Sequence, residues 1–185
     1  MKSINDIRET AIHGNLSIER TCFVFFDIET TGLHAYKGAK IIESACITRN
    51  EVLQNWRINP QKTSDDALVT MLPELMNHLK KGVLVGHNIC FDLNFIAYKA
   101  GKLGINGPEV NFIDTMMLSK RILEKIRSYK LEFLLHYFDI AIKGELHTAM
   151  VDVHATQALF WKLIEKGEIS TLKEAGVKRV NWTFC

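Results

Sequence analysis

The chain has 185 residues, of which 47% are hydrophobic and 24% are charged, and its net charge is +2. This length and hydrophobic content are typical of one globular domain with a substantial core. The small net charge excludes a protein whose whole surface is basic, although a local acidic site with a basic rim remains open. No apolar run approaches the length of about eighteen residues that a membrane span needs, so we expect a soluble, cytoplasmic protein with no membrane partner.

The four cysteines lie far apart in the sequence and form no closely spaced pair. Metal sites and redox motifs rely on short cysteine spacings. We therefore interpret these residues as reduced core thiols of an intracellular protein. They are Cys22, Cys46, Cys90 and Cys185.

Hydrophobic patterns divide the chain into an N-terminal extension (1–20), a single domain (21–166) and a C-terminal tail (167–185). In the extension, Ile4, Ile7 and Ile12 are candidate anchors for a short helix. Within the domain, apolar periodicity and turn residues predict the strands and helices. The predicted strands are 21–29, 41–48, 52–59, 83–85 and 110–113, and the predicted helices are 68–79, 89–100, 116–126, 131–138 and 148–166.

Short connections predict that the first three strands form an antiparallel meander. Strands and helices then alternate, which predicts an α/β architecture of three layers, with a mixed five-stranded sheet flanked by helices. The sheet would consist of the meander plus two further strands. No internal repeat or low-complexity segment interrupts this pattern.

The first strand ends in two carboxylates, Asp27 and Glu29, one residue apart. Side chains alternate along a strand, so both acids lie on one face, beside aromatic rings. Burying two neighbouring carboxylates is costly unless a cation compensates their charge. A divalent metal ion is one solution, because hard cations bind carboxylate oxygens. The alternative is a strand end at which both acids reach solvent.

The turn Gly86-His87-Asn88 precedes a helix with Asp92 near its start. We predict that Asn88 is the N-cap of this helix. Asp92 borders the apolar face, where the helix dipole stabilises a carboxylate, so a purely structural role is an equal alternative. For His87 the alternatives are a hydrogen-bonded structural residue and a ligand.

A third acid lies at the start of the last predicted helix. Thr148 is expected to cap this helix, and Asp152 then falls in its first turn or just after it, on a core-facing stripe. His147 precedes the cap, in a loop that could hold an imidazole over a site without burying it. Histidine is a suitable general base for water. The alternative is a solvent-exposed loop histidine.

Four carboxylates and one loop histidine therefore lie at strand or helix ends beside the core. This set fits two-metal phosphodiester hydrolysis, in which one ion helps to make hydroxide and the other stabilises the leaving oxygen, with the ions about 4 Å apart. The predicted set is Asp27, Glu29, Asp92, Asp152 and His147.

Three motifs in this order resemble the DEDDh family of 3′-to-5′ exonucleases, which has the ribonuclease H-like fold. They are Phe-Asp-Ile-Glu-Thr-Thr-Gly-Leu from residue 26, Gly-His-Asn-x-x-Phe-Asp from residue 86, and His147 with Asp152 five residues on. The resemblance runs from about Phe23 to Trp161. It also includes Ile41-Ile42-Glu43 and Ile113-Asp114-Thr115.

The resemblance implies a role for each of these residues. Asp27 would bridge two divalent cations, Mg²⁺ or Mn²⁺, and Glu29 and Asp152 would complete the site that activates water. Asp92 would support the second ion, and His147 would be the general base. Leu33 would wedge against the base of the terminal nucleotide, and the residues implied to contact or shape its pocket are Thr30, Thr31, Gly32, Leu33, His87, Asn88 and Phe91.

The resemblance therefore implies a metal-dependent exonuclease that acts on the single-stranded or frayed 3′ end of DNA and releases nucleoside monophosphates, as proofreading and repair nucleases do. One alternative is an RNA-trimming exoribonuclease similar to oligoribonuclease or ribonuclease T. An alternative of another class is a catalytically silent module that binds nucleic acid or docks on a polymerase subunit. For a proofreading or repair nuclease that acts on DNA, a polymerase subunit is a candidate partner.

One feature departs from the family pattern. Relatives of proofreading subunits usually carry an Ile-His-Gly-like segment before the Gly-His-Asn turn, and the stretch 60–73 is too short to hold it. Residues 11–14, Ala-Ile-His-Gly, resemble that segment but precede the first predicted strand. The sequence therefore does not predict the shape of the substrate entrance.

Overall fold

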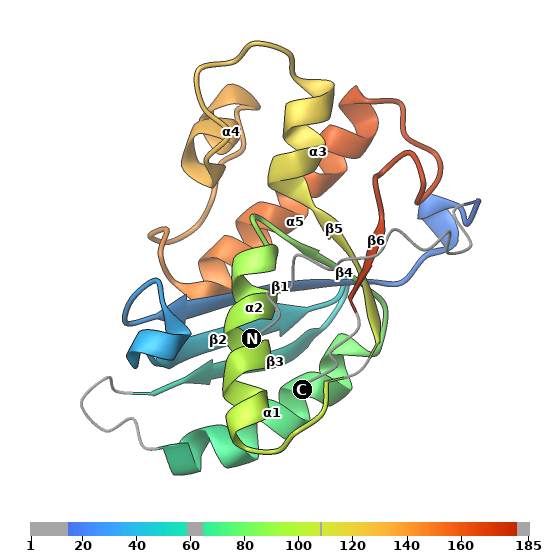
Figure 1. Cartoon of the computed structure of the whole chain (residues 1–185). Helices are drawn as coiled ribbons and strands as arrows, with labels where there is room; N and C mark the ends of the chain where they lie inside the picture. The colour runs from blue at the N-terminus through green and yellow to red at the C-terminus, as the bar shows by residue number, and fades with distance from the viewer. Residues whose placement is uncertain (1–14, 59–64, 108, 181–185) are drawn as a thin grey trace.

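The computed structural model describes residues 15–58, 65–107 and 109–180. These residues form three layers, with a central sheet and helices on both of its faces (Figure 1). The predicted helix in the extension, the segment 11–14, the stretch 59–64 before the first helix and Cys185 lie outside the described residues.

The central sheet is mixed, with the strand order β3-β2-β1-β4-β5-β6. β1, β2 and β3 form the predicted antiparallel meander, and β4 and β5 run parallel to β1. The strands are β1 (Phe23–Thr30), β2 (Ile41–Ile47), β3 (Val52–Arg57), β4 (Val83–Gly86), β5 (Val110–Asp114) and β6 (Lys178–Val180).

The predicted number of strands is wrong, because the described residues form a sheet of six strands and not five. The sixth strand, β6, pairs antiparallel with β5, from Val180 opposite Val110 to Lys178 opposite Phe112. Three residues are too few to show an alternating hydrophobic pattern. This strand is defined by its pairing with a distant segment, which local sequence does not reveal.

Five α-helices cover the two faces of the sheet in the described part of the chain. α1 and α2 pack on one face, and α3, α4 and α5 pack on the other. In Figure 1, α2 crosses the near face of the sheet and α5 lies behind it. The helices are α1 (Asp65–Leu79), α2 (Cys90–Lys102), α3 (Thr115–Ile122), α4 (Leu131–Tyr137) and α5 (Ala149–Lys166).

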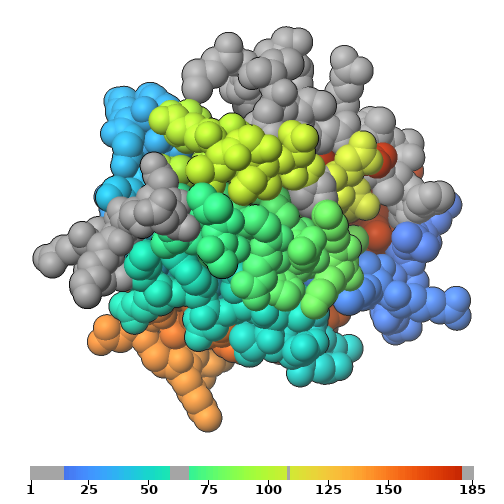
Figure 2. Space-filling model, turned by 90° about the horizontal axis from the view of Figure 1, so that it is seen from below, coloured from blue at the N-terminus to red at the C-terminus, as the bar shows by residue number. Residues whose placement is uncertain are grey.

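Two further features of the helices bear on the predictions. α3 ends at Ile122, earlier than predicted, because Leu123 has an extended backbone with φ of −105° and ψ of 98°. A 3₁₀ turn, η2 (Ala35–Lys37), lies in the β1–β2 connection and contacts α2. Figure 2 shows the blue surface of this connection beside α2.

Among the described residues, no helix is long and apolar enough to cross a bilayer.

β1 lies in the middle of the sheet, and its side chains pack into the hydrophobic clusters on both faces. Val24, Phe26 and Ile28 pack towards α1 and α2, whereas Phe23 and Phe25 pack towards α5. The ring centroids of Phe25 and Phe160 of α5 are 5.7 Å apart. Alternation then places the two acids of β1 on the α5 face. Helix α5 is therefore fixed against the strand that carries them.

The prediction that Asn88 caps α2 is wrong. The helix begins at Cys90, and Ile89 occupies the N-cap position. Asn88 instead adopts a left-handed backbone with φ of 60°, which asparagine tolerates better than most residues. A Cβ atom on Gly86 would lie 2.8 Å from the Ile89 side chain, so only glycine fits this close turn. The tight turn brings the start of α2 directly to the end of β4.

The three described cysteines, Cys22, Cys46 and Cys90, are free. Cys46 is buried, as predicted for a core thiol, and Cys90 is partly buried. The prediction is wrong for Cys22, which is exposed because it precedes β1 and lies outside the sheet.

Candidate active site

The end of β1 is open on one side. β1 pairs with β4 only through Phe23–Phe25, so the following residues have a strand partner only on the β2 side. Asp92 of α2 fills part of the gap, because its Oδ1 accepts a hydrogen bond from the backbone N–H of Ile28 at 3.1 Å. Asp92 is only 4% exposed. An acid of α2 thus lies beside the acids of β1.

The N-terminus of α5 brings a further acid and the histidine to this place. Asp152 lies in the first turn of α5, and its Oδ1 accepts a hydrogen bond from the backbone N–H of His147 at 3.2 Å. His147 is exposed and has a left-handed backbone, with φ of 70°. The loop before α5 is therefore folded back onto the first turn of the helix.

Three of the five predicted residues form a compact group of metal-ligand atoms. Within the described residues, one ligand atom each of Glu29, His147 and Asp152 lies within 4.8 Å of the other two. The group joins the end of β1 to the start of α5. Its oxygen and imidazole donors suit a divalent cation.

Asp27 and Asp92 interact electrostatically with the acids of this group. Burial raises the pKa of Asp27 well above its usual range, and the charges of Asp92 and Asp152 raise it further. Burial also raises the pKa of Asp92 well above its usual range, although its hydrogen bond from Ile28 opposes this shift. Without a cation, these carboxylates are held close together with too little positive charge to balance them.

The pKa values of the other two acids, Glu29 and Asp152, are also raised. Burial raises the pKa of Glu29, as does the charge of Asp152, while His147 lowers it. Burial raises the pKa of Asp152, and its hydrogen bond from His147 lowers it. A bound divalent cation would remove this mutual repulsion, so the residues present fit a metal ion.

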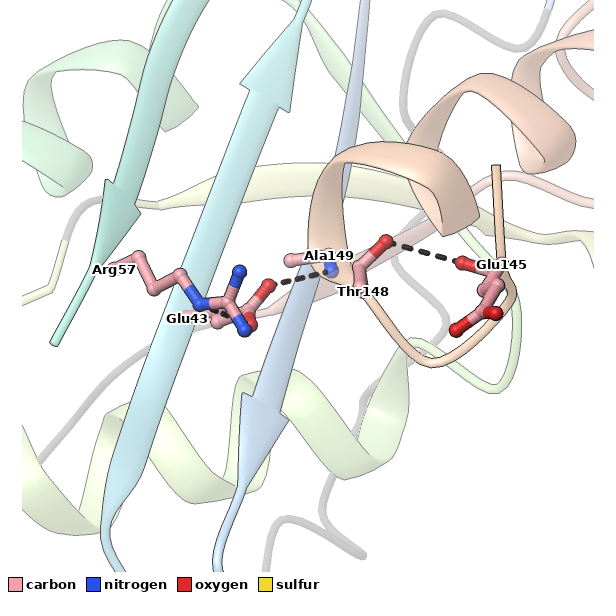
Figure 3. Close-up of polar contacts among 5 residues, drawn as sticks. All are labelled: Glu43, Arg57, Glu145, Thr148 and Ala149. Atoms are coloured by element: carbon pink, nitrogen blue, oxygen red, sulfur yellow. Dashed lines mark hydrogen bonds and ion pairs between the residues drawn. The ribbon is translucent and has the colours of Figure 1, made fainter. Parts of the chain in front are cut away.

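Glu43 is an additional acid at this site. In the sequence it stands out only as part of the resemblance, and no role is predicted for it. It lies opposite Glu29 in the β1–β2 pair and is 9% exposed. Its Oε2 accepts a hydrogen bond from the backbone N–H of Ala149 at 3.2 Å, and its Oε1 lies 2.9 Å from Nε of Arg57 (Figure 3). The available signal was an acid at an inward-facing position of a largely apolar strand.

Thr148 occupies the N-cap position of α5, as predicted, but its side chain does not cap the helix. Its hydroxyl donates instead to the backbone carbonyl of Glu145 at 3.2 Å. The carboxylate of Glu43 takes its place at the first N–H of the helix. A long-range contact has thus replaced the local cap that the sequence predicts.

His87 is held by hydrogen bonds on both ring nitrogens. Nε2 lies 3.0 Å from the carbonyl oxygen of Tyr129, which can only accept, so Nε2 carries the proton. Nδ1 lies 2.9 Å from Oγ1 of Thr115, whose single hydroxyl proton can be donated to Nδ1 or to the carbonyl oxygen of Gly86 at 3.2 Å. Burial lowers the pKa of His87 to about 4, which keeps the ring neutral. These contacts favour the structural alternative for His87.

The predicted nucleotide-binding residues lie on two neighbouring segments. The loop after β1 is fixed internally, because Thr30 Oγ1 donates to the carbonyl of Gly32 at 2.8 Å and Lys40 N–H donates to Thr31 Oγ1 at 2.9 Å. Leu33 projects from it and is 76% exposed. Asn88 is also exposed, whereas Phe91 is partly buried, with its ring centroid 5.8 Å from that of Phe95.

Comparison with known proteins adds a family and relatives. A model of the family described as "Exonuclease" matches residues 49–160. The chain is 33% identical over 179 residues to a PolC-type DNA polymerase III of Caldanaerobacter subterraneus subsp. tengcongensis, an alignment that covers 86% of this chain and 12% of the relative. It is 28% identical to the 3′-5′ exonuclease DinG of Bacillus subtilis, covering 78% of this chain and 18% of DinG. The chain therefore spans less than a fifth of these relatives.

Solved structures confirm the predicted α/β fold. A structure of exonuclease X in complex with 5′ overhanging duplex DNA has a TM-score of 0.58 at 19% identity, covering 83% of this chain and 98% of that one. Cell-death related nuclease 4 has a TM-score of 0.58 at 17% identity, covering 82% of this chain and 65% of that one. At such identities the likeness concerns the fold alone.

Proposed function

The chain belongs to the exonuclease family, and from this premise we propose that it is a metal-dependent 3′-to-5′ exonuclease that hydrolyses phosphodiester bonds at the 3′ end of DNA. The observation that supports this most strongly is the meeting of acids from β1, α2 and α5 beside one exposed histidine. Support for DNA comes from relatives named as DNA polymerase III. A silent binding module would have no need for four mutually repelling acids at one place.

The proposed metal-binding residues are Asp27, Glu29, Asp92 and Asp152. Two divalent cations, Mg²⁺ or Mn²⁺, would supply activation of water and stabilisation of the leaving oxygen when bound there. Asp27 would hold the cations together with acids of both helices, because the charges of Asp92 of α2 and Asp152 of α5 both raise its pKa. The remaining chemistry belongs to the side chains of the protein itself.

We assign the general base to His147. An exposed imidazole can take a proton from the attacking water and release it to bulk solvent, which a buried imidazole does less readily. The hydrogen bond from its backbone N–H to Asp152 holds the loop close to the acids. His147 would thus act on the water without needing a permanent place among the ligands.

The terminal nucleotide is proposed to bind between the loop 30–33 and the turn before α2. We expect Leu33→Ala to raise KM for single-stranded DNA by about tenfold with kcat little changed, because an exposed leucine that packs on a base contributes on the order of 1.4 kcal/mol. Initial rates on a 5′-labelled oligonucleotide measure both constants. Leu16→Ala is the matched control, since Leu16 is also exposed but precedes β1 at its other end. Equal KM values for the two variants would contradict this role.

The direct test is digestion of 5′-labelled single-stranded DNA, mismatched duplex DNA and RNA of matched sequence, with and without Mg²⁺ or Mn²⁺. We expect a ladder of products shortened from the 3′ end, release of nucleoside monophosphates, and no cleavage of circular single-stranded DNA. Faster digestion of RNA than of DNA would favour the RNA-trimming alternative. Absence of metal-dependent product on every substrate would contradict the proposal and favour a silent module.

A further inference from the structure

We propose that Glu43 is a positioning residue of this site, which fixes the N-terminus of α5 and thereby places Asp152 and His147. Arg57 holds the Glu43 carboxylate in the required orientation. The inference rests on the function proposed above, but it concerns residues outside the metal-binding set. Figure 3 shows Glu43 lying between Arg57 and the first residue of α5.

Three strands contribute to this contact. Glu29 of β1, Glu43 of β2 and Arg57 of β3 are Cα partners in one row across the sheet. Partners in a row project on the same face, which here is the face that α5 covers. The row therefore leads from the proposed metal ligand Glu29 to an exposed arginine on β3, with Glu43 between them.

Both carboxylate oxygens of Glu43 are engaged. Oε1 faces Nε of Arg57 at 2.9 Å, and Oε2 accepts from the N–H of Ala149 at 3.2 Å. A carboxylate with both oxygens bound in this way is poorly placed to bind a metal ion as well. Glu43 also lies outside the compact group of ligand atoms found in the described residues. Its geometry is that of a bridge between the sheet and α5.

Helix α5 needs this bridge because the side chain of its N-cap residue, Thr148, does not cap it. The first N–H groups of a helix have no partner within the helix, and Ala149 is only 1% exposed, so water does not readily replace a partner. The Thr148 hydroxyl is turned away to the carbonyl of Glu145. Glu43 supplies the acceptor, and its negative charge also suits the positive end of the helix dipole.

The position of two proposed active-site residues depends on this turn of helix. The N–H of Asp152 donates to the carbonyl of Thr148 at 3.0 Å, and its carboxylate holds the N–H of His147. Loosening the contact at Ala149 would therefore displace both the acid and the base. The Glu43 charge also raises the pKa of Asp152, so a variant that removes the charge but keeps the acceptor separates this electrostatic effect from misplacement.

The test compares Glu43→Gln with Glu43→Ala. The single amide oxygen of glutamine can still accept from Ala149, although the ion pair with the exposed Arg57 is lost, so we expect kcat within about threefold of the parent. Glu43→Ala should lower kcat about 10- to 100-fold, as for other residues that orient ligands, with KM for the oligonucleotide changed less than about twofold. Glu51→Ala is the matched control, because Glu51 is an exposed acid in the β2–β3 turn. Equal kcat values for Glu43→Ala and Glu51→Ala would overturn the inference.

Two further measurements keep the test independent of the proposed function. Amide hydrogen exchange over 147–152 should be faster in Glu43→Ala than in the parent and unchanged in Glu43→Gln. This readout remains valid if the parent protein proves inactive on DNA and RNA, so the two proposals can fail separately. Unchanged exchange in Glu43→Ala would overturn the positioning role. Loss of stabilisation by Mn²⁺ in Glu43→Gln would also overturn it, because Glu43 would then be a metal ligand.

Discussion

Asp27→Asn should lower kcat on single-stranded DNA by on the order of 10³-fold and at the same time stabilise the metal-free protein. The two effects have one cause. The Asp27 carboxylate is buried among other acids, which raises its pKa well above the usual range, so its charged form costs free energy at neutral pH. Asparagine keeps nearly the same shape but removes the charge that would bind a cation.

The pH dependence of stability follows from the direction of this shift. An unfolded aspartate has a pKa of about 3.9, and the folded-state pKa of Asp27 lies well above it. Between these two values the folded state binds more protons than the unfolded state, so the free energy of unfolding falls as pH rises. Asp92, Asp152 and Glu29 shift in the same direction. The metal-free parent should therefore lose stability from about pH 4 towards neutrality.

Thermal unfolding of the parent and Asp27→Asn, with chelator or with Mn²⁺ between pH 4 and 8, measures these effects. We expect Mn²⁺ to raise the Tm of the parent strongly and that of Asp27→Asn weakly, and the variant to lose less stability with rising pH. Asp139→Asn is the matched control, because Asp139 is an exposed acid outside the site. A metal-free Asp27→Asn protein that unfolds at a lower Tm than the parent would contradict the electrostatic account.

The elements that the sequence predicted well are those whose pattern reflects burial. β1 is recognisable because it is apolar on both faces, with Phe25 packing towards α5 and Phe26 towards α2. Its change to acids at Asp27 comes just after the pairing of β1 with β4 ends at Phe25, where the strand end opens. The local sequence therefore predicts Asp27 and Glu29, the part of the site that lies on β1.

The contacts that complete the site join segments far apart in the chain, and local patterns do not specify them. Asp92 was predicted near a helix start, but its hydrogen bond to the N–H of Ile28 depends on how α2 docks against β1. Glu43 meets Ala149 across the α5 side of the sheet, in place of the Thr148 cap that the helix sequence favours. β6 is visible only through its pairing with β5.

His147→Asn should lower kcat by roughly 10²- to 10⁴-fold at pH 7, with KM for DNA little changed, because it removes the proposed base and leaves the nucleotide contacts intact. Asparagine is the suitable replacement, since it tolerates the left-handed backbone at this position, where φ is 70°. His154→Asn is the matched control, because His154 is an exposed histidine on α5. Parent-like kcat in His147→Asn would contradict the assignment.

The same variant separates a base from a metal ligand. A ring nitrogen of His147 lies within 4.8 Å of carboxylate oxygens of Glu29 and Asp152, so the alternative role of its imidazole is to bind the cation. As a base, His147→Asn should keep the stabilisation by Mn²⁺ that the parent shows, whereas loss of a ligand would reduce it. His147→Gly adds a second criterion, because glycine accepts the positive φ and leaves an open space at an exposed position. Added imidazole should restore part of its kcat if the missing group is a proton acceptor, and a lack of rescue together with a lost Mn²⁺ effect would assign His147 to the metal.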